Sequence, residues 1–197
     1  MTNLFKNKYR IPSHRLRGWN YAKNGHYFIT IVTHGRQCVF GQVLNGEMVL
    51  NDIGQIVYDE FYRSFMIREE LFLGEFVLMP NHLHAIVILD KPNCTNCRDA
   101  RPCVSTGWPT FPQFQRQPKS ISTFVACFKS STINQIDNWI DSNHLIMPKF
   151  NNNNPLWQAN YHDHIIRNEI EYQKISEYIK CNPIKWGNDI LSEQNFG

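Results

Sequence analysis

Hydrophobic and polar positions along the chain follow two periods, one typical of strands and the other of helices. Residues 26–33 are rich in aromatic and β-branched side chains and predict a first strand. The stretch 38–50 predicts a hairpin, because an Asn-Gly pair interrupts it and favours a tight turn. Two further runs, 71–79 and 82–89, predict antiparallel neighbours, because only a Pro-Asn turn separates them.

Three segments carry apolar residues at helical spacing. The first follows a capping pair at 51–52 and runs to about residue 67, and the second begins near residue 119 or 120. The third runs from about Arg167 until just before Pro183, because proline disfavours helical geometry in the preceding residue. The order β-β-β-α-β-β-α-α predicts an α+β fold, in which helices pack against an antiparallel sheet.

Neither period is present between about residues 90 and 118, which hold five of the ten prolines. This composition predicts a surface loop inserted into the domain. We therefore expect a single domain over 26–190, interrupted by this loop and preceded by an N-terminal arm over 1–25.

Three cysteines of the insertion, Cys94, Cys97 and Cys103, have the close spacing of half a zinc site. A structural zinc site takes four ligands, and no fourth lies nearby in the sequence. A reduced, exposed loop is therefore the favoured interpretation, and zinc binding is the alternative.

The composition is that of an ordinary globular protein, with 42% hydrophobic and 19% charged residues in 197 and a net charge of +3. The first 23 residues carry six lysines and arginines, Arg15 and Arg17 among them, and no acidic residue. Such an arm suits a phosphate backbone, and a solvated N-terminus is the alternative. The chain has no membrane-spanning run and no secretory signal, so we expect a cytoplasmic protein with reduced cysteines.

His82 and His84 are two residues apart in the strand predicted over 82–89. Alternate side chains of a strand share a face, so the two imidazoles are expected side by side. Neutral imidazole is the commonest protein ligand for metals, and this pair suits one divalent cation. The alternative is a hydrogen-bonded pair at a strand end, because so short a pattern often occurs by chance.

Tyr178 and Asn182 are four residues apart in the last predicted helix and so share a helix face. An amide oxygen at Asn182 would complete a metal site begun by the histidines, and Tyr178 would present its phenol beside it. Tyrosine has a free pKa of about 10, and a nearby cation assists its attack on a phosphate. The alternative is a tyrosine packed in the core and an asparagine that ends the helix.

The chain resembles the REP-associated tyrosine transposases, which belong to the HUH superfamily of single-strand nucleases. The family's recurring segments occur in the same order over roughly residues 10–190, the insertion excepted. They are Tyr27-Phe28-Ile29-Thr30, Met79-Pro80-Asn81-His82-Leu83-His84, the helix over 119–129, 156–168 with its Leu-Trp-Gln and His-Asp-His motifs, and Tyr178-Ile179-Lys180-Cys181-Asn182-Pro183-Ile184-Lys185.

This resemblance implies a ferredoxin-like α+β fold and transesterification of single-stranded, hairpin-bearing DNA through a 5′-phosphotyrosine. It implies His82, His84 and Asn182 as ligands of Mg²⁺ or Mn²⁺, with Tyr178 as the nucleophile. Two imidazoles and an amide are a softer set than Mg²⁺ usually takes, which favours Mn²⁺. A place in the bacterial nucleoid and a homodimer are further expectations, and whether the tyrosine acts in its own subunit stays open.

Basic and aromatic residues around the last helix are candidate DNA contacts. Arg167, Lys174 and Lys185 would bind phosphates, and Trp157 and Tyr161 would stack on unpaired bases. A core position is the alternative for Trp157. The family's sequences commonly end this part with a small residue, a glycine and a hydrophobic residue, and the segment 186–189 differs from that pattern. The difference lies beyond the helix, so it affects the expected DNA contacts rather than the chemistry.

Two other functions share these residues. One is a non-catalytic binder of DNA or RNA hairpins with the same fold. The other is a metal-dependent phosphoesterase that uses water in place of tyrosine. The presence of two histidines, a tyrosine and an asparagine in the family's positions favours the enzyme with a tyrosine nucleophile, because a binding protein has no need of all four.

Overall fold

The computed structural model describes residues 19–91 and 119–188. Three predictions therefore lie outside the described residues. They are the DNA contacts at Arg15 and Arg17, the loop over most of the insertion, and the zinc alternative for the clustered cysteines.

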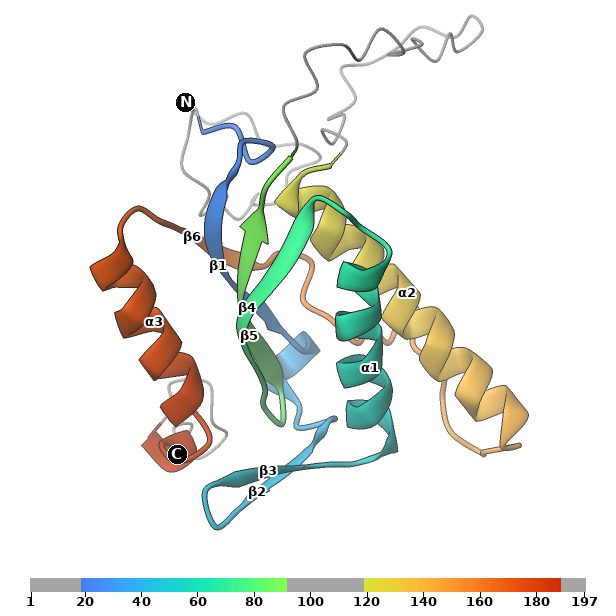
Figure 1. Cartoon of the computed structure of the whole chain (residues 1–197). Helices are drawn as coiled ribbons and strands as arrows, with labels where there is room; N and C mark the ends of the chain where they lie inside the picture. Colours follow the sequence, from blue (N-terminus) through green and yellow to red (C-terminus); the bar gives the residue numbers. More distant parts are fainter. Residues whose placement is uncertain (1–18, 92–118, 189–197) are drawn as a thin grey trace, which may run out of the picture.

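A four-stranded antiparallel sheet forms the centre of the molecule, with the strand order β4-β5-β1-β6 (Figure 1). Its strands are β1 (Gly25–Val32), β4 (Leu71–Leu78), β5 (His82–Leu89) and β6 (His162–Ile166). Helix α1 (Asp52–Met66) connects β1 to β4, and α2 (Ile121–Ser142) lies between β5 and β6. The resulting order β-α-β-β-α-β is the ferredoxin-like arrangement, so the predicted α+β fold class is confirmed.

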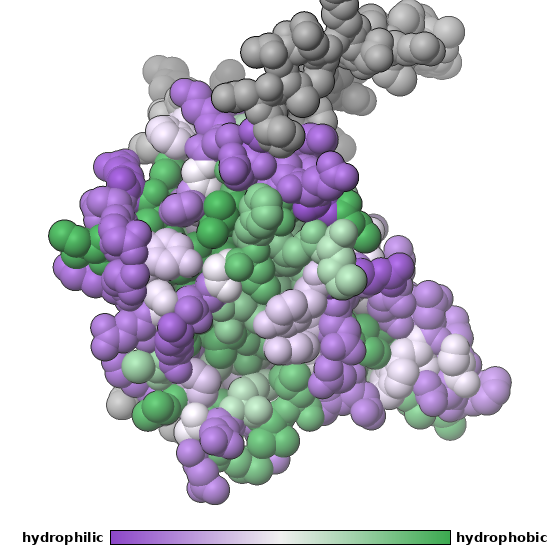
Figure 2. Space-filling model, in the orientation of Figure 1, coloured by the Kyte–Doolittle hydropathy of each residue, from purple (hydrophilic) through white to green (hydrophobic). Residues whose placement is uncertain are grey.

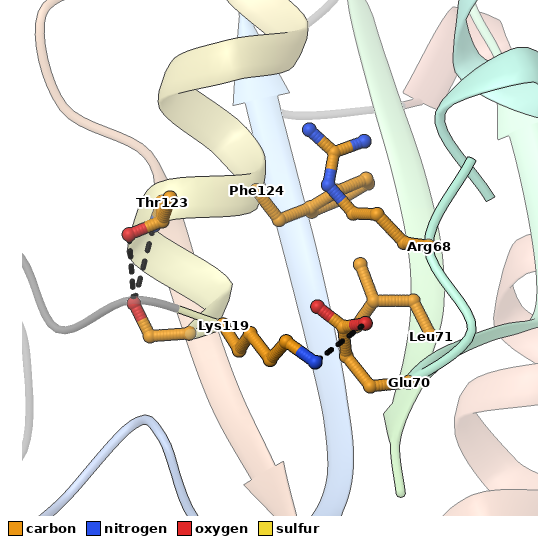
Figure 3. A pocket seen from close by; sticks show the side chains of 7 residues that line it. Arg68, Glu70, Leu71, Lys119, Thr123 and Phe124 are labelled. Carbon is orange, nitrogen blue, oxygen red and sulfur yellow. Dashed lines mark hydrogen bonds and ion pairs between the residues drawn. The ribbon is translucent and has the colours of Figure 1, made fainter. Parts of the chain in front are cut away.

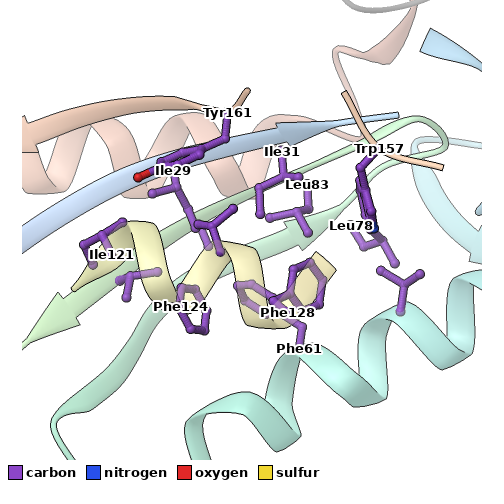
Figure 4. Packing of buried hydrophobic residues seen from close by; sticks show 14 of the residues in the cluster. Ile29, Ile31, Phe61, Leu78, Leu83, Ile121, Phe124, Phe128, Trp157 and Tyr161 are labelled. Atoms are coloured by element: carbon purple, nitrogen blue, oxygen red, sulfur yellow. The ribbon is translucent and has the colours of Figure 1, made fainter. Parts of the chain in front are cut away.

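Helices α1 and α2 cover one face of this sheet and enclose the main hydrophobic core (Figure 1). Both begin where the sequence supplies a cap: Asn51 accepts a hydrogen bond from the amide of Gly54, and Ser120 accepts one from the amide of Thr123. Figure 4 shows Phe61 of α1 and Phe128 of α2 meeting beneath the strands. Removing such buried rings from water is the main source of the stability of this layer.

Helix α3 (Glu169–Cys181) lies on the opposite face of the sheet, where the buried apolar cluster is smaller (Figure 1). It ends just before Pro183, as predicted. Lys180 forms an ion pair with Glu75 of β4 at 2.8 Å. A Cβ atom at Gly74 would lie only 2.8 Å from the hydroxyl of Tyr172, so glycine permits the close approach of α3 to β4.

A further helical turn, η2 (His34–Arg36), follows β1, and two short elements lie near the end of α3. The predicted hairpin is formed by β2 (Gly41–Leu44) and β3 (Glu47–Leu50), which pair with each other and not with the main sheet. A helical turn, η3 (Trp186–Asn188), follows α3. Apolar side chains gather on the visible surface over the sheet between α3 and α1 (Figure 2).

The sequence did not predict β6, because the first three of its five residues have polar side chains. The strand pairs with β1 from His26↔Ile166 to Thr30↔His162. Its conformation therefore depends on the ladder that β1 offers, and this tertiary contact overrides the weak local preference. No helix in the described ranges is long and apolar enough to cross a membrane.

Candidate active site

Alternation along β5 separates the two histidines from the main core. Leu83 and Ala85 belong to the cluster beneath α1 and α2, whereas Ile86 belongs to the cluster beneath α3. His82 and His84 therefore point to the α3 side, and their ring centroids are 4.5 Å apart. Both rings are buried, with exposed fractions of 0% for His82 and 3% for His84. The predicted pair on one strand face is present.

The end of α3 brings Tyr178 and Asn182 to this pair. The Tyr178 hydroxyl lies 3.2 Å from Nε2 of His84, and the Asn182 side chain lies close enough to His82 to raise the pKa of that imidazole. Residues 94 positions apart in the chain thus form one cluster. Asn182 is buried, whereas Tyr178 is 42% exposed, so the phenol is the member of the four that faces solvent.

Two neighbouring residues hold the imidazoles in place, and sequence analysis did not identify either. Nδ1 of His84 lies 2.8 Å from Oγ1 of Thr30, which stands directly opposite it in the β1–β5 ladder. Nδ1 of His82 lies 2.8 Å from Oδ1 of Asn81. Only the strand register and the turn geometry reveal these contacts, although Asn81 is adjacent to His82 in the sequence.

The surroundings of His82 keep its imidazole neutral. Burial lowers the pKa of His82 to about 3, against the opposing effect of its hydrogen bond to Asn182. A neutral imidazole is the form that binds metals. No group of three or more His, Cys, Asp or Glu side chains suited to a metal occurs in the described chain, so the candidate set depends on the amide of Asn182. Two imidazoles and an amide fit a divalent transition metal better than Mg²⁺.

A protein from Haemophilus influenzae, described as uncharacterized, is 35% identical over 177 residues, and the match covers 90% of each chain. The two proteins belong to one family. No family model matches the chain. Among solved structures, that of a REP-associated tyrosine transposase bound to a REP hairpin aligns with 90% of this chain and 75% of its own, with a TM-score of 0.53 and 18% identity.

This chain has the fold of a REP-associated tyrosine transposase. The resemblance noted in the sequence is thereby confirmed at the level of fold. Within this transposase fold, the histidine pair lies at the start of β5, next to the central strand β1, and the tyrosine lies on the helix that follows the last strand.

The basic residues predicted to bind DNA lie at different distances from Tyr178. Lys174 and Tyr178 are one helical turn apart on α3, so both side chains lie on the same side of the helix. Lys185 is exposed and follows the end of α3. Arg167 precedes the other end of the helix, roughly 16 Å away along its axis. The structure thus places Lys174 beside the candidate nucleophile and Arg167 well away from it.

Trp157 and Tyr161 lie on the other side of the sheet, in the core layer beneath α2 (Figure 4). Trp157 packs against Phe40 and Phe128 and is 6% exposed, and Tyr161 is 8% exposed. Both line a groove of about 480 Å³ beside α2, away from the cluster of histidines. Trp157 thus occupies the core position that the sequence left open as its alternative, and the stacking of these rings on unpaired bases stays a prediction.

A smaller pocket of about 200 Å³ lies at the start of α2 (Figure 3). Leu71 in its lining pairs with Leu89, at the end of β5 opposite His82. Lys119 and Glu70 form an ion pair across it at 3.9 Å. Its lining is Arg68, Glu70, Leu71, Lys119, Ser120, Thr123 and Phe124. It contains no histidine, cysteine or tyrosine, so it offers neither the nucleophile nor the ligands of the cluster beneath α3.

Proposed function

We propose that this protein is a metal-dependent endonuclease and strand transferase of single-stranded DNA that uses Tyr178 as its nucleophile. One observation carries the proposal: an exposed phenol stands 3.2 Å from a buried imidazole, beside a second imidazole in contact with an amide. The exposure of Tyr178 suits a group that must reach a large substrate. The burial of His82, His84 and Asn182 suits groups that act from beneath Tyr178.

The reaction exchanges one phosphodiester for another. The Tyr178 oxygen attacks the scissile phosphorus and forms an O–P bond, while the bond from phosphorus to the 3′-oxygen breaks. The phenolic proton leaves to solvent, and the released 3′-oxygen takes up a proton from solvent. A 3′-hydroxyl later attacks the phosphotyrosine and restores the phenol, so strands are rejoined without ATP.

His82, His84 and Asn182 would hold the divalent cation, Mn²⁺ or Mg²⁺. A cation held there would supply Lewis-acid polarisation of the phosphate and favour the ionised phenol. The remaining work belongs to the chain. Burial keeps His82 neutral and available as a ligand, and the ladder between β1 and β5 fixes the distance between the two imidazoles. Phe28 stacks on His84 with ring centroids 5.3 Å apart and restricts the motion of that ring.

We infer that the substrate is single-stranded DNA carrying a hairpin, which would make palindromic repeats the targets. The similar fold of a transposase bound to a REP hairpin supports this inference. Lys174 on α3 and Lys185 after it are exposed basic side chains that would contact the phosphate backbone. A homodimer and an association with the bacterial nucleoid belong to the same proposal.

A labelled single-stranded hairpin incubated with the protein and Mn²⁺, then run on a denaturing gel, tests this function. We expect a covalent protein–DNA adduct in the wild type, and none in Tyr178→Phe or after chelation of the metal. Duplex DNA of the same sequence should give no adduct. Binding without an adduct would favour the non-catalytic hairpin binder, and cleavage that survives Tyr178→Phe would favour a phosphoesterase that uses water.

A further inference from the structure

We propose that Asn81 is a positioning residue that fixes the tautomer of His82, so that its Nε2 keeps a lone pair for the metal. This inference rests on the proposed function, because it assigns a role within the same site. It adds a residue outside the predicted ligand set and a physical property, the ring tautomer, that is measurable without DNA.

The amide of Asn81 has one orientation that satisfies both of its neighbours. Its Nδ2 donates a hydrogen bond of 2.9 Å to the backbone carbonyl of Arg36, and its Oδ1 lies 2.8 Å from Nδ1 of His82. A carbonyl oxygen only accepts hydrogen bonds, so the NH₂ group must face Arg36. The amide oxygen then faces the imidazole, and it also only accepts, so Nδ1 of His82 must carry the proton.

A neutral imidazole carries a single N–H. His82 is 0% exposed, and burial away from water favours the neutral form of an imidazole. With the proton on Nδ1, Nε2 carries the lone pair. That nitrogen is the ring atom left to bind a metal ion. In metalloproteins, such outer contacts to a ligand histidine set its tautomer and its orientation.

The carbonyl of Arg36 is itself held in place by the segment 33–40. Arg36 has a φ of 57°, a left-handed conformation that few residues other than glycine adopt. The amide of Thr33 donates to the carbonyl of Asn81 at 2.8 Å, and the amide of Phe40 donates to that of Pro80 at 3.0 Å. These bonds hold the segment 33–40 against the β4–β5 turn. Such fixed surroundings maintain the unfavourable φ of Arg36.

Thr30 does not do the same for His84. A threonine hydroxyl both donates and accepts, so its 2.8 Å contact with Nδ1 is compatible with either tautomer. The two histidines thus differ: the fold dictates the proton position on His82, whereas the proton on His84 is free to follow its partners.

The test is long-range ¹H–¹⁵N NMR on protein labelled at histidine, without metal, together with titration of Mn²⁺ followed by electron paramagnetic resonance. In the wild type we expect His82 to carry its proton on Nδ1. Asn81→Leu removes the acceptor, and we expect a shift toward the Nε2–H tautomer with a loss of Mn²⁺ affinity of about 10- to 100-fold. Asn81→Asp retains an acceptor, so it should keep the tautomer and most of the affinity.

Asn143→Leu makes the same change at the end of α2 and should alter neither measurement. An Nε2–H tautomer in the wild type would overturn the inference, even if Asn81→Leu fails to fold. Unchanged Mn²⁺ affinity in a folded Asn81→Leu variant would do so too, as would a wild type that binds no Mn²⁺. If the tautomer and the affinity behave as expected but no adduct forms on DNA, the proposed function fails and the role of Asn81 stands.

Discussion

The two faces of the central sheet bury different kinds of side chain. Beneath α1 and α2, the strands contribute apolar residues to a large cluster with aromatic rings such as Phe61 and Phe128. Beneath α3, the same strands present two histidines and a threonine, and the buried apolar cluster contains only Ile86, Ile166 and Ile179 among the described residues. A shift of one position along β5 is enough to pass from one environment to the other.

This difference assigns stability mainly to one face and chemistry to the other. Burial of apolar surface beneath α1 and α2 supplies most of the favourable free energy of folding. The face beneath α3 accommodates buried polar groups only because they contact one another, as His84 contacts Thr30 and Tyr178. Substitutions on the two faces should therefore affect different measurements.

Tyr178→Phe should have the largest effect on activity, a loss of at least about 1,000-fold in the rate of DNA cleavage, because it removes the attacking oxygen. The melting temperature should change little, since the ring stays in contact with Phe28 and His84. Tyr62→Phe on α1 is the matched control, because Tyr62 is equally exposed at 42%. Comparable rates in the two variants would remove Tyr178 from the mechanism.

Phe128→Ala should have the largest effect on stability, a loss of about 3–5 kcal/mol in the free energy of unfolding, because the ring is fully buried. Urea denaturation measures this loss. Phe72→Ala, at a position 52% exposed, should cost far less. The Mn²⁺ affinity of folded Phe128→Ala should match that of the wild type, and a large drop would show that the two faces are not independent.

Lys174→Ala should weaken binding of single-stranded hairpin DNA and lower the slope of log affinity against log salt by about 0.7, as expected for one lost phosphate contact. Fluorescence anisotropy over a range of salt concentrations measures the slope. Lys149→Ala is the control, because Lys149 forms an ion pair with Asp141 at 2.6 Å, away from α3. Equal slopes in the two variants would place the DNA elsewhere.

Glu75→Gln should have the smallest effect. It breaks the ion pair between Glu75 and Lys180, which is partly exposed, so the melting temperature should change little. Asp141→Asn breaks the exposed pair with Lys149 and should have a similarly small effect on the melting temperature. A much larger destabilisation from Glu75→Gln would mean that α3 depends on this contact for its position.

The sequence predicted the elements that local patterns determine. Alternation placed His82 and His84 on one face, and the four-residue spacing placed Tyr178 and Asn182 on one side of a helix. The capping asparagine before α1 and the proline after α3 gave their ends to within about two residues. These features depend on residues that are close in the sequence, and for that reason local patterns predicted them.

What the sequence did not predict depends on contacts between distant segments. β6 is a strand because β1 pairs with it, although His162, Asp163 and His164 give little local signal. Trp157 lies in the core because it packs against Phe40 and Phe128, which no local pattern distinguishes from an exposed stacking platform. Thr30 meets His84 only through the register of β1 with β5.

Mass spectrometry of the covalent product tests most directly which residue attacks the DNA. The protein is incubated with a single-stranded hairpin and Mn²⁺, the product is digested with nuclease and protease, and the nucleotide-bearing peptide is sequenced. We predict a 5′-phosphate nucleotide on Tyr178, and no labelled peptide from Tyr178→Phe. A nucleotide on any other residue, or cleavage with no covalent product at all, would contradict the assignment of Tyr178 as the nucleophile.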